Sequence, residues 1–95
     1  MSQASEFEQR WSVKGFTHFV THTDQPHTHY APHTHEKDFL HFIISGDMTL
    51  ILDQTSFILS KGQEYLIPAG KEHEVKIGED GCTYISAERL YADQR

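Results

Sequence analysis

Two histidines, His33 and His35, stand two residues apart, and an apolar segment that ends at Gly46 follows them. In an extended strand, side chains at positions i and i+2 leave the same face, so both imidazole rings point the same way. Imidazole is the commonest protein ligand for transition metals. The spacing therefore predicts that His33 and His35 form half of a metal site on the inner face of a sheet, with further ligands supplied by another part of the chain.

The composition limits the partners that this site can serve. The chain has 95 residues, which suit one domain, and eight of them are histidines. The formal net charge of −6 argues against nucleic acid or an anionic membrane as the main partner. No apolar run approaches the roughly 20 residues that span a bilayer. Residues 1–10 lack an apolar leader segment and Cys82 is the only cysteine, so we expect a cytoplasmic protein without internal disulfides.

The elements that must position the histidines are predicted to be short strands. Segments rich in β-forming residues recur every 8–12 residues or so, with a turn signal between each pair. The expected strands cover residues 16–22, 39–44, 48–52, 57–59, 64–67, 72–77 and 82–87. This pattern predicts an all-β fold, a small antiparallel sandwich or barrel, and no convincing helix.

Two connections and the chain ends complete this prediction. Asp53 and Gln54 lack the glycine that a tight type I′ turn prefers, so we expect a looser connection there. Residues 78–81 contain two glycines and are predicted to form a hairpin loop. We expect a flexible or edge-strand arm over residues 1–14, with one short helical turn in residues 1–10 as the alternative, a barrel over residues 15–88 and a polar tail over residues 89–95.

Two stretches of the chain together resemble the two motifs of the cupin family. The matching residues are His33, His35 and Gly46 in the first stretch and Gly62, Pro68, Gly70 and His73 in the second. The resemblance covers residues 32–87 and implies an antiparallel jelly-roll β-barrel. It also implies that His33, His35 and His73 meet around one divalent transition metal, namely iron, zinc, nickel or manganese.

The sequence departs from the family pattern where a glutamate ligand would stand. Phe39 falls at that position, which leaves a three-histidine site with open coordination positions. His41 lies two residues further on and shares the inward face, so it is either a fourth ligand, if a bulge shifts the strand, or a base that faces the substrate. Glu36 and Asp38 are alternative carboxylate ligands, but their place near a strand entrance favours a solvated position.

Each candidate residue also has an interpretation that involves no chemistry. His33, His35 and His73 could be ordinary barrel histidines without a metal. His27 and His29 are expected to be surface histidines, with a place at the barrel mouth as the alternative. His18 and His22 are expected on one strand face that meets solvent or a second subunit. The expected core consists of Phe39, Phe42, Ile43, Met48, Leu50, Phe57, Leu66, Val75 and Ile85. Tyr65, Tyr84 and Cys82 are expected to pack rather than react.

Three kinds of function follow from the resemblance. The first is a metal-dependent dioxygenase, isomerase or lyase that acts on a small molecule, with His41 as general base. The second is a non-catalytic sensor-type module that binds a small molecule, and the third is a storage role, which suits larger two-barrel proteins. Because small barrels leave strand edges exposed, we also expect a homodimer with a contact through residues 11–20.

Overall fold

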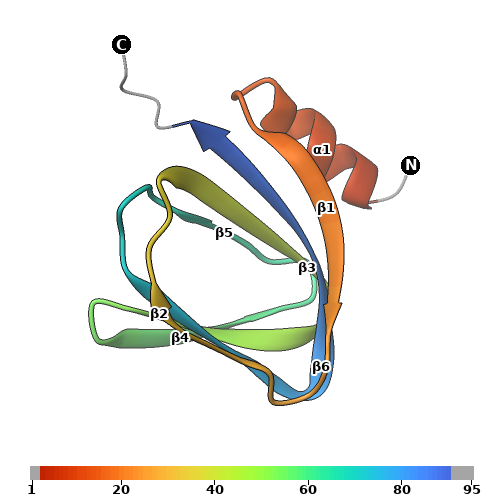
Figure 1. The fold of residues 1–95 in the computed structure, drawn as a ribbon. Coiled ribbons are helices and arrows are strands. Elements are labelled where there is room, and N and C mark those ends of the chain that lie inside the picture. The colour runs from red at the N-terminus through yellow and green to blue at the C-terminus, as the bar shows by residue number, and fades with distance from the viewer. Residues whose placement is uncertain (1–2, 91–95) are drawn as a thin grey trace.

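The computed structural model describes residues 3–90 of the chain, which form one short helix and six strands. All paired strands run antiparallel, in the order β1-β6-β3-β4, with β2 added to β6 and β5 added to β3. Figure 1 shows β2 to β6 curling around a common interior, while α1 lies outside them. The predicted all-β antiparallel jelly-roll fold is confirmed. The elements are α1 (Gln3–Ser12), β1 (Thr17–Asp24), β2 (His29–His33), β3 (Lys37–Leu52), β4 (Thr55–Ser60), β5 (Glu64–Ile67) and β6 (His73–Leu90).

Two long strands, β3 and β6, form the centre of the sheet. Each replaces two of the expected strands, and the predicted hairpin loop at residues 78–81 is wrong because β6 continues through it. The β3–β6 register shifts around Gly46, where φ is +75° and an added Cβ would overlap the carbonyl oxygen of Gly81. Glycine therefore marks a bulge here, which lets the paired strands bend together without ending.

The connection between β3 and β4 is tighter than predicted. Leu52 pairs with Thr55, so Asp53 and Gln54 alone make the turn. Their φ angles are +52° and +67°, the positive values that a type I′ turn requires at both central residues. The expectation of a looser connection is wrong, because Asp and Gln occupy the left-handed region here without a glycine.

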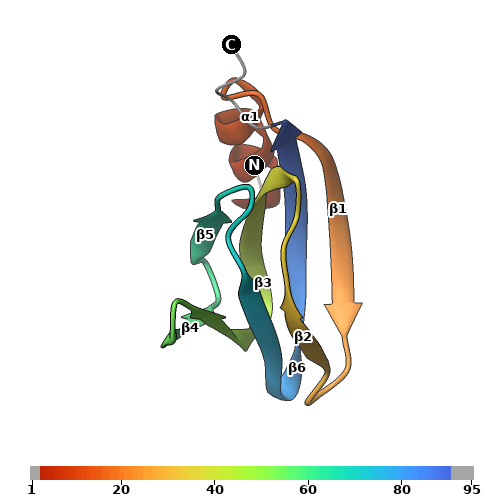
Figure 2. The same cartoon turned by 60° about the vertical axis from the view of Figure 1, so that its left-hand side comes forward.

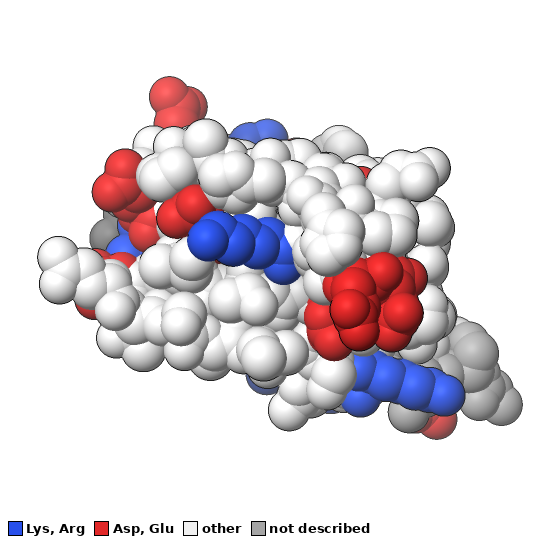
Figure 3. Space-filling view, turned by 90° about the horizontal axis from the view of Figure 1, so that it is seen from below, with Lys and Arg blue, Asp and Glu red and all other residues white. Residues whose placement is uncertain are grey.

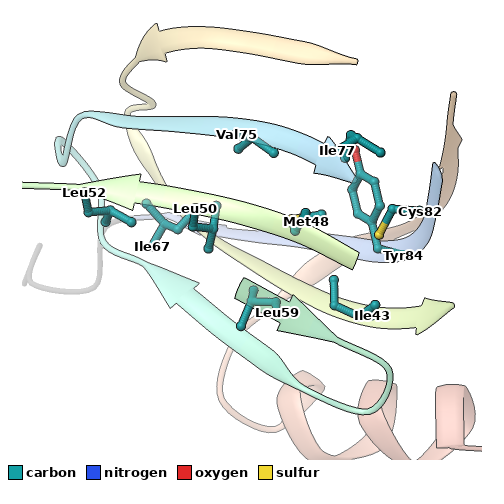
Figure 4. Close-up of a cluster of buried hydrophobic side chains, with 10 residues drawn as sticks. All are labelled: Ile43, Met48, Leu50, Leu52, Leu59, Ile67, Val75, Ile77, Cys82 and Tyr84. Atoms are coloured by element: carbon teal, nitrogen blue, oxygen red, sulfur yellow. The ribbon is translucent and has the colours of Figure 1, made fainter. Parts of the chain in front are cut away.

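Apolar side chains from β3, β4, β5 and β6 fill the interior of the curled sheet. Figure 4 shows this inner cluster, which consists of Ile43, Met48, Leu50, Leu52, Leu59, Ile67, Val75, Ile77, Cys82 and Tyr84. Burying one large apolar side chain contributes about 1.5–3 kcal/mol. Of the expected core residues, Phe39, Phe57 and Leu66 are only partly buried and pack at the edges of the clusters.

A second cluster lies on the other face of β3 and β6, under α1. It consists of Phe7, Phe16, Leu40, Phe42, Ile85 and Ala87. Ala4, Phe7 and Trp11 follow a helical period and give α1 one apolar side. Phe7 stacks on Phe42 with 4.7 Å between ring centroids. The expectation of a flexible or edge-strand arm over residues 1–14 is therefore wrong, and the helix is longer than the single turn that was the alternative.

The remaining boundaries are close to those expected. Strand β6 runs to Leu90, two residues beyond the predicted end of the barrel, and residues 91–95 of the predicted tail lie outside the described residues. Figure 2 shows β1 at the rim of the molecule, paired on one side only. The single described helix is too short to cross a lipid bilayer. On the face seen in Figure 3, uncharged residues cover most of the surface and the Lys and Arg side chains are scattered.

Candidate metal centre

The three predicted ligand histidines meet at one end of the curled sheet. His33 is the last residue of β2, His35 lies in the connection to β3, and His73 is the first residue of β6. His33 and His73 are direct partners in the β2–β6 register. One ring nitrogen from each histidine lies within 4.8 Å of the other two. The structure therefore brings together the side chains that the motifs predicted, from two distant segments, and we call them the histidine triad.

Backbone carbonyls fix the orientation of two of these rings. His33 Nδ1 donates a hydrogen bond to the carbonyl oxygen of Ala31 at 2.6 Å, and His73 Nδ1 donates to that of Lys71 at 3.0 Å. A carbonyl oxygen only accepts, so the proton of each neutral ring sits on Nδ1 and the lone pair sits on Nε2. Metal-binding histidines are commonly held in this way. The donor set thus fits a borderline divalent cation.

His35 is held by stacking and through its backbone. Its ring lies on Phe39 with 4.0 Å between centroids and 17° between the planes. Phe39 therefore supports His35 from the position where the family pattern has a glutamate ligand. The carbonyl oxygen of His35 accepts a hydrogen bond from Gly70 at 2.8 Å, in the loop before β6. Gly70 has a φ of +81°, so the loop needs a residue that tolerates the left-handed region.

The environment lowers the pKa of two of the three histidines, His35 and His73. Burial, followed by the neighbouring rings of His33 and His73, lowers the pKa of His35. Burial also lowers the pKa of His73, although the carbonyl of Lys71 acts in the opposite direction. A neutral imidazole is the form that binds metals, because a proton and a cation compete for the same lone pair.

Neither of the alternative carboxylates joins the histidine triad. Asp38 is 5% exposed, pairs with Arg89 at 2.8 Å and accepts a hydrogen bond from the Ala69 N–H. Its carboxylate anchors the loop before β6, so the prediction of a solvated Asp38 is wrong, and so is its alternative role as a ligand. Glu36 is exposed, as expected, and lies outside the group of converging donors.

A cavity of about 230 Å³ adjoins the histidine triad. Phe39, Met48 and Val75 form its apolar wall. The other residues that line it are polar, namely His22, Tyr30, His41, Tyr84 and Ser86. None of the described residues that line this cavity is an Asp, Glu, Lys or Arg.

The sequence predicted only part of this cavity lining. The structure also tests the predictions for two histidines outside the histidine triad. His22 was expected, together with His18, on a strand face that meets solvent or a second subunit. It is exposed, as expected, and it also lines the cavity. The β1 register is irregular between Thr17 and Val20, so strict alternation does not relate the two histidines. His29 is exposed and pairs with Glu74, which confirms the surface reading for it.

His41 lines the cavity but stands apart from the histidine triad. It is not among the donors that converge within 4.8 Å of one another. Its Nδ1 is sealed from solvent without a hydrogen-bond partner. Burial, and then the charges that nearby histidines would carry, lowers the pKa of His41 to about 4. A general base works best with a pKa near the working pH, so a neutral His41 suits hydrogen bonding better than proton abstraction.

An aspartate holds the two tyrosines of the cavity. The hydroxyls of Tyr30 and Tyr84 each donate to Asp24 Oδ2 at 2.8 Å. Burial and this carboxylate raise the pKa of both phenols, so they stay protonated. Their protons are therefore committed to Asp24 and are not available to a ligand.

Comparison with known proteins gives the same fold. A family model described as a cupin domain matches residues 20–86. Among curated protein sequences, none matches this chain significantly. The cupin domain of Schizosaccharomyces pombe Cnp3 superposes with a TM-score of 0.72 at 13% identity, over 80% of this chain and 56% of that chain. This chain thus spans little more than half of that relative.

Two further structures are similar in fold. Protein NMB1881 of Neisseria meningitidis has a TM-score of 0.65 at 26% identity, over 79% of this chain and 74% of that chain. Bacillus subtilis oxalate decarboxylase, a protein with Mn(II) centres, has a TM-score of 0.68 at 16% identity. The match covers 90% of this chain but only 24% of the decarboxylase.

Proposed function

This chain belongs to the cupin family, and on that basis we propose that it binds one divalent transition-metal ion through its histidine triad and a small organic molecule beside it. The observation that carries the proposal is the convergence of three ring nitrogens within 4.8 Å. The two Nδ1 hydrogen bonds to carbonyls support it, because they direct the Nε2 lone pairs of His33 and His73 away from the backbone. Iron, zinc, nickel and manganese all remain candidates.

A bound divalent cation would supply Lewis acidity, which polarises an oxygen of a bound ligand. The residues of the chain do the rest: the triad holds the ion, Phe39 orients His35, and the cavity provides the space for the ligand. The alternative, a non-catalytic sensor-type module, is favoured by one observation. Among the described residues that line the cavity there is no carboxylate or amine to transfer a proton, and the low pKa of His41 makes it a weak base.

Metal analysis tests the proposal directly. Untagged protein would be dialysed against Zn²⁺, Mn²⁺, Fe²⁺ or Ni²⁺ and analysed for elements. We expect about one equivalent of the preferred metal in the wild type and loss of most of it in His73→Ala. His29→Ala is the matched control, since that histidine is exposed and outside the triad. Equal metal content in the wild type and His73→Ala, with both folded by circular dichroism, would overturn the proposal.

We also propose that the protein forms a homodimer and works in the reducing cytoplasm, where its single cysteine needs no disulfide partner. Within the segment expected at the contact, residues 11–20, Trp11 packs on Phe16 inside the chain. Val13 and Val20 are 84% and 48% exposed, and β1 has an unpaired edge, so these parts of the segment are available for the contact. Sedimentation at micromolar concentration tests this, and a monomer would contradict it.

A further inference from the structure

A second set of polar side chains faces the cavity from three adjoining strands. His41 of β3 is the direct partner of Ser86 of β6, and His22 of β1 reaches the same serine, with 2.9 Å between Nε2 and Oγ. All three residues line the cavity and none belongs to the histidine triad. We call His22, Ser86 and His41 the polar row.

The hydrogen-bonding capacity of the polar row is not used up within the chain. Among the described residues, the ring of His41 has no hydrogen-bond partner, and its Nδ1 is sealed from solvent, so Nε2 is the ring nitrogen left to the cavity. A buried orphan N–H is rarer in proteins than an under-satisfied acceptor. This favours the tautomer with the proton on Nε2, which presents a donor to the cavity. Ser86 can accept from His22 and turn its own O–H toward the same space.

The rest of the lining makes these donors distinctive. The phenol protons of Tyr30 and Tyr84 are bound to Asp24, and Phe39, Met48 and Val75 are apolar. A divalent cation held by three neutral imidazoles keeps its full charge, because no lining carboxylate offsets it. Such a cavity favours an anion near the triad and an oxygen acceptor near the polar row.

We propose that the polar row is a second anchor, which binds a carbonyl or hydroxyl oxygen of a small organic acid whose carboxylate lies on the side of the histidine triad. This inference rests on the proposed metal function. His35 stacks on Phe39, and His41 follows one strand repeat of about 6–7 Å beyond Phe39 on the same face, so the two anchors lie along one wall of the cavity. The cavity of about 230 Å³ is below the roughly 300 Å³ of sites for drug-sized ligands, which fits a compact acid.

The test uses two acids that differ only in one oxygen. Zinc is suitable because it has no redox chemistry. Zinc-loaded protein would be titrated by calorimetry with 4-oxopentanoate, which has a carboxylate and a ketone, and with pentanoate, which lacks the ketone. We expect the wild type to bind 4-oxopentanoate about 3- to 10-fold more tightly, the range expected for one net hydrogen bond. His41→Phe should bind both acids equally.

Controls separate the failures of the two proposals. His29→Phe should keep the wild-type preference, and Ser86→Ala, the milder change, should reduce it even if His41→Phe is poorly folded. The zinc content of every sample is measured by elemental analysis. Wild-type protein that binds neither zinc nor any of the other three metals would overturn the proposed function and this inference with it. If zinc is bound, three results would overturn the polar row alone. The wild type could bind both acids equally, it could bind neither acid, or its preference for the ketone could survive in both variants.

Discussion

The two faces of the central strand pair β3 and β6 are built for different tasks. Alternate residues point to opposite sides, so Leu40 and Ile85 lie in the cluster under α1 while His41 and Ser86 line the cavity. The outer face is apolar, closely packed and closed by aromatic contacts such as Phe7 on Phe42. The inner face carries histidine rings. The Nδ1 of His41 has no hydrogen-bond partner among the described residues, and the Nδ1 atoms of His33 and His73 donate to backbone carbonyls.

The difference shows how a small barrel can keep polar groups inside. Buried polar groups without partners destabilise a fold, as the sealed Nδ1 of His41 must do. The outer face offsets this with an additional apolar layer from a helix that is not needed to close the barrel. We therefore expect the outer face to contribute to stability alone, and metal and ligand binding to depend on the inner face.

The largest expected effect is the loss of stability when the packing of the outer face is disrupted. Phe7 is fully buried, so Phe7→Ala should lower the free energy of unfolding by about 3–5 kcal/mol through lost burial and the cavity left behind. Metal affinity at the histidine triad should not change in the folded protein. Urea unfolding followed by circular dichroism, with metal titration at low urea, measures both.

Val13→Ala is the control for this prediction. Val13 follows α1 directly and is 84% exposed, so its truncation should change stability by no more than about 0.5 kcal/mol. If Phe7→Ala weakened metal binding in protein that is still folded, the two faces would be coupled through the strands and the division of tasks would be wrong.

The sequence predicted the architecture well where alternation and turn residues agree. The motifs identified the jelly-roll class, and β5 was predicted with its observed bounds. The errors occur where the same residue type is common in two different local structures. Gly46 and Gly81 signal a turn and a bulge equally, so β3 and β6 were divided into shorter strands. Helix α1 was missed because a ten-residue helix depends on packing against the sheet, which composition does not reveal.

The site was predicted in part for a similar reason. His33, His35 and His73 follow from spacing that a motif preserves, and the structure brings them together. His22 and Ser86 carry no motif, because they meet only through the register between β1 and β6. A sequence without a fold cannot supply that register.

The next prediction concerns how the free energy of unfolding depends on pH, through a histidine of the inner face. In the folded protein, burial lowers the pKa of His41 from 6.5 to about 4. Between these values the unfolded chain binds more protons than the folded one, so the free energy of unfolding falls as the pH falls from 6.5 toward 4. At about 1.4 kcal/mol for each pH unit, His41 accounts for about 3 kcal/mol. Urea unfolding of chelator-treated protein from pH 7 to pH 4 measures it.

The variant His41→Phe tests this assignment. It removes the titrating ring and the unpartnered nitrogen, so the acid-side slope should become shallower, and stability at pH 7 should be unchanged or higher. The lowered pKa values of His35 and His73 act in the same direction and should leave a residual slope. An unchanged slope in the variant would mean that His41 is not the main acid-sensitive group.

A smaller effect concerns metal-dependent stability. A ligand that binds only the folded state raises the free energy of unfolding by about 2.7 kcal/mol when its concentration is 100 times its dissociation constant. We expect an increase of that size for the wild type in the presence of the preferred metal, and none for His33→Ala. Phe7→Ala should show the full increase on its lower baseline, because distant sites contribute additively. A reduced increase in Phe7→Ala, measured by the same urea titrations, would argue against independent faces.

The smallest expected effect concerns the polar contacts that fasten α1 to β5. Both oxygens of Glu64 lie 2.9 Å from Arg10 Nη1, and Trp11 Nε1 donates to Oε2 at 3.0 Å. The Arg10 side chain is 47% exposed, so this pair is worth at most about 1 kcal/mol. Glu64→Gln keeps an acceptor for Trp11 and should lose that amount at low salt, and almost nothing at 1 M salt, where charges are screened within about 3 Å.

Asp53→Asn is the matched control, since it breaks the more exposed pair with Lys71 at the β3–β4 turn and should change stability less. The two variants should bind metal equally, because Glu64 fastens the outer helix and does not line the cavity. A loss above about 2 kcal/mol, or weaker metal binding in Glu64→Gln alone, would show that the position of α1 reaches the inner face through β5. That result would make the helix part of the site and not only a cover for the apolar side of the sheet.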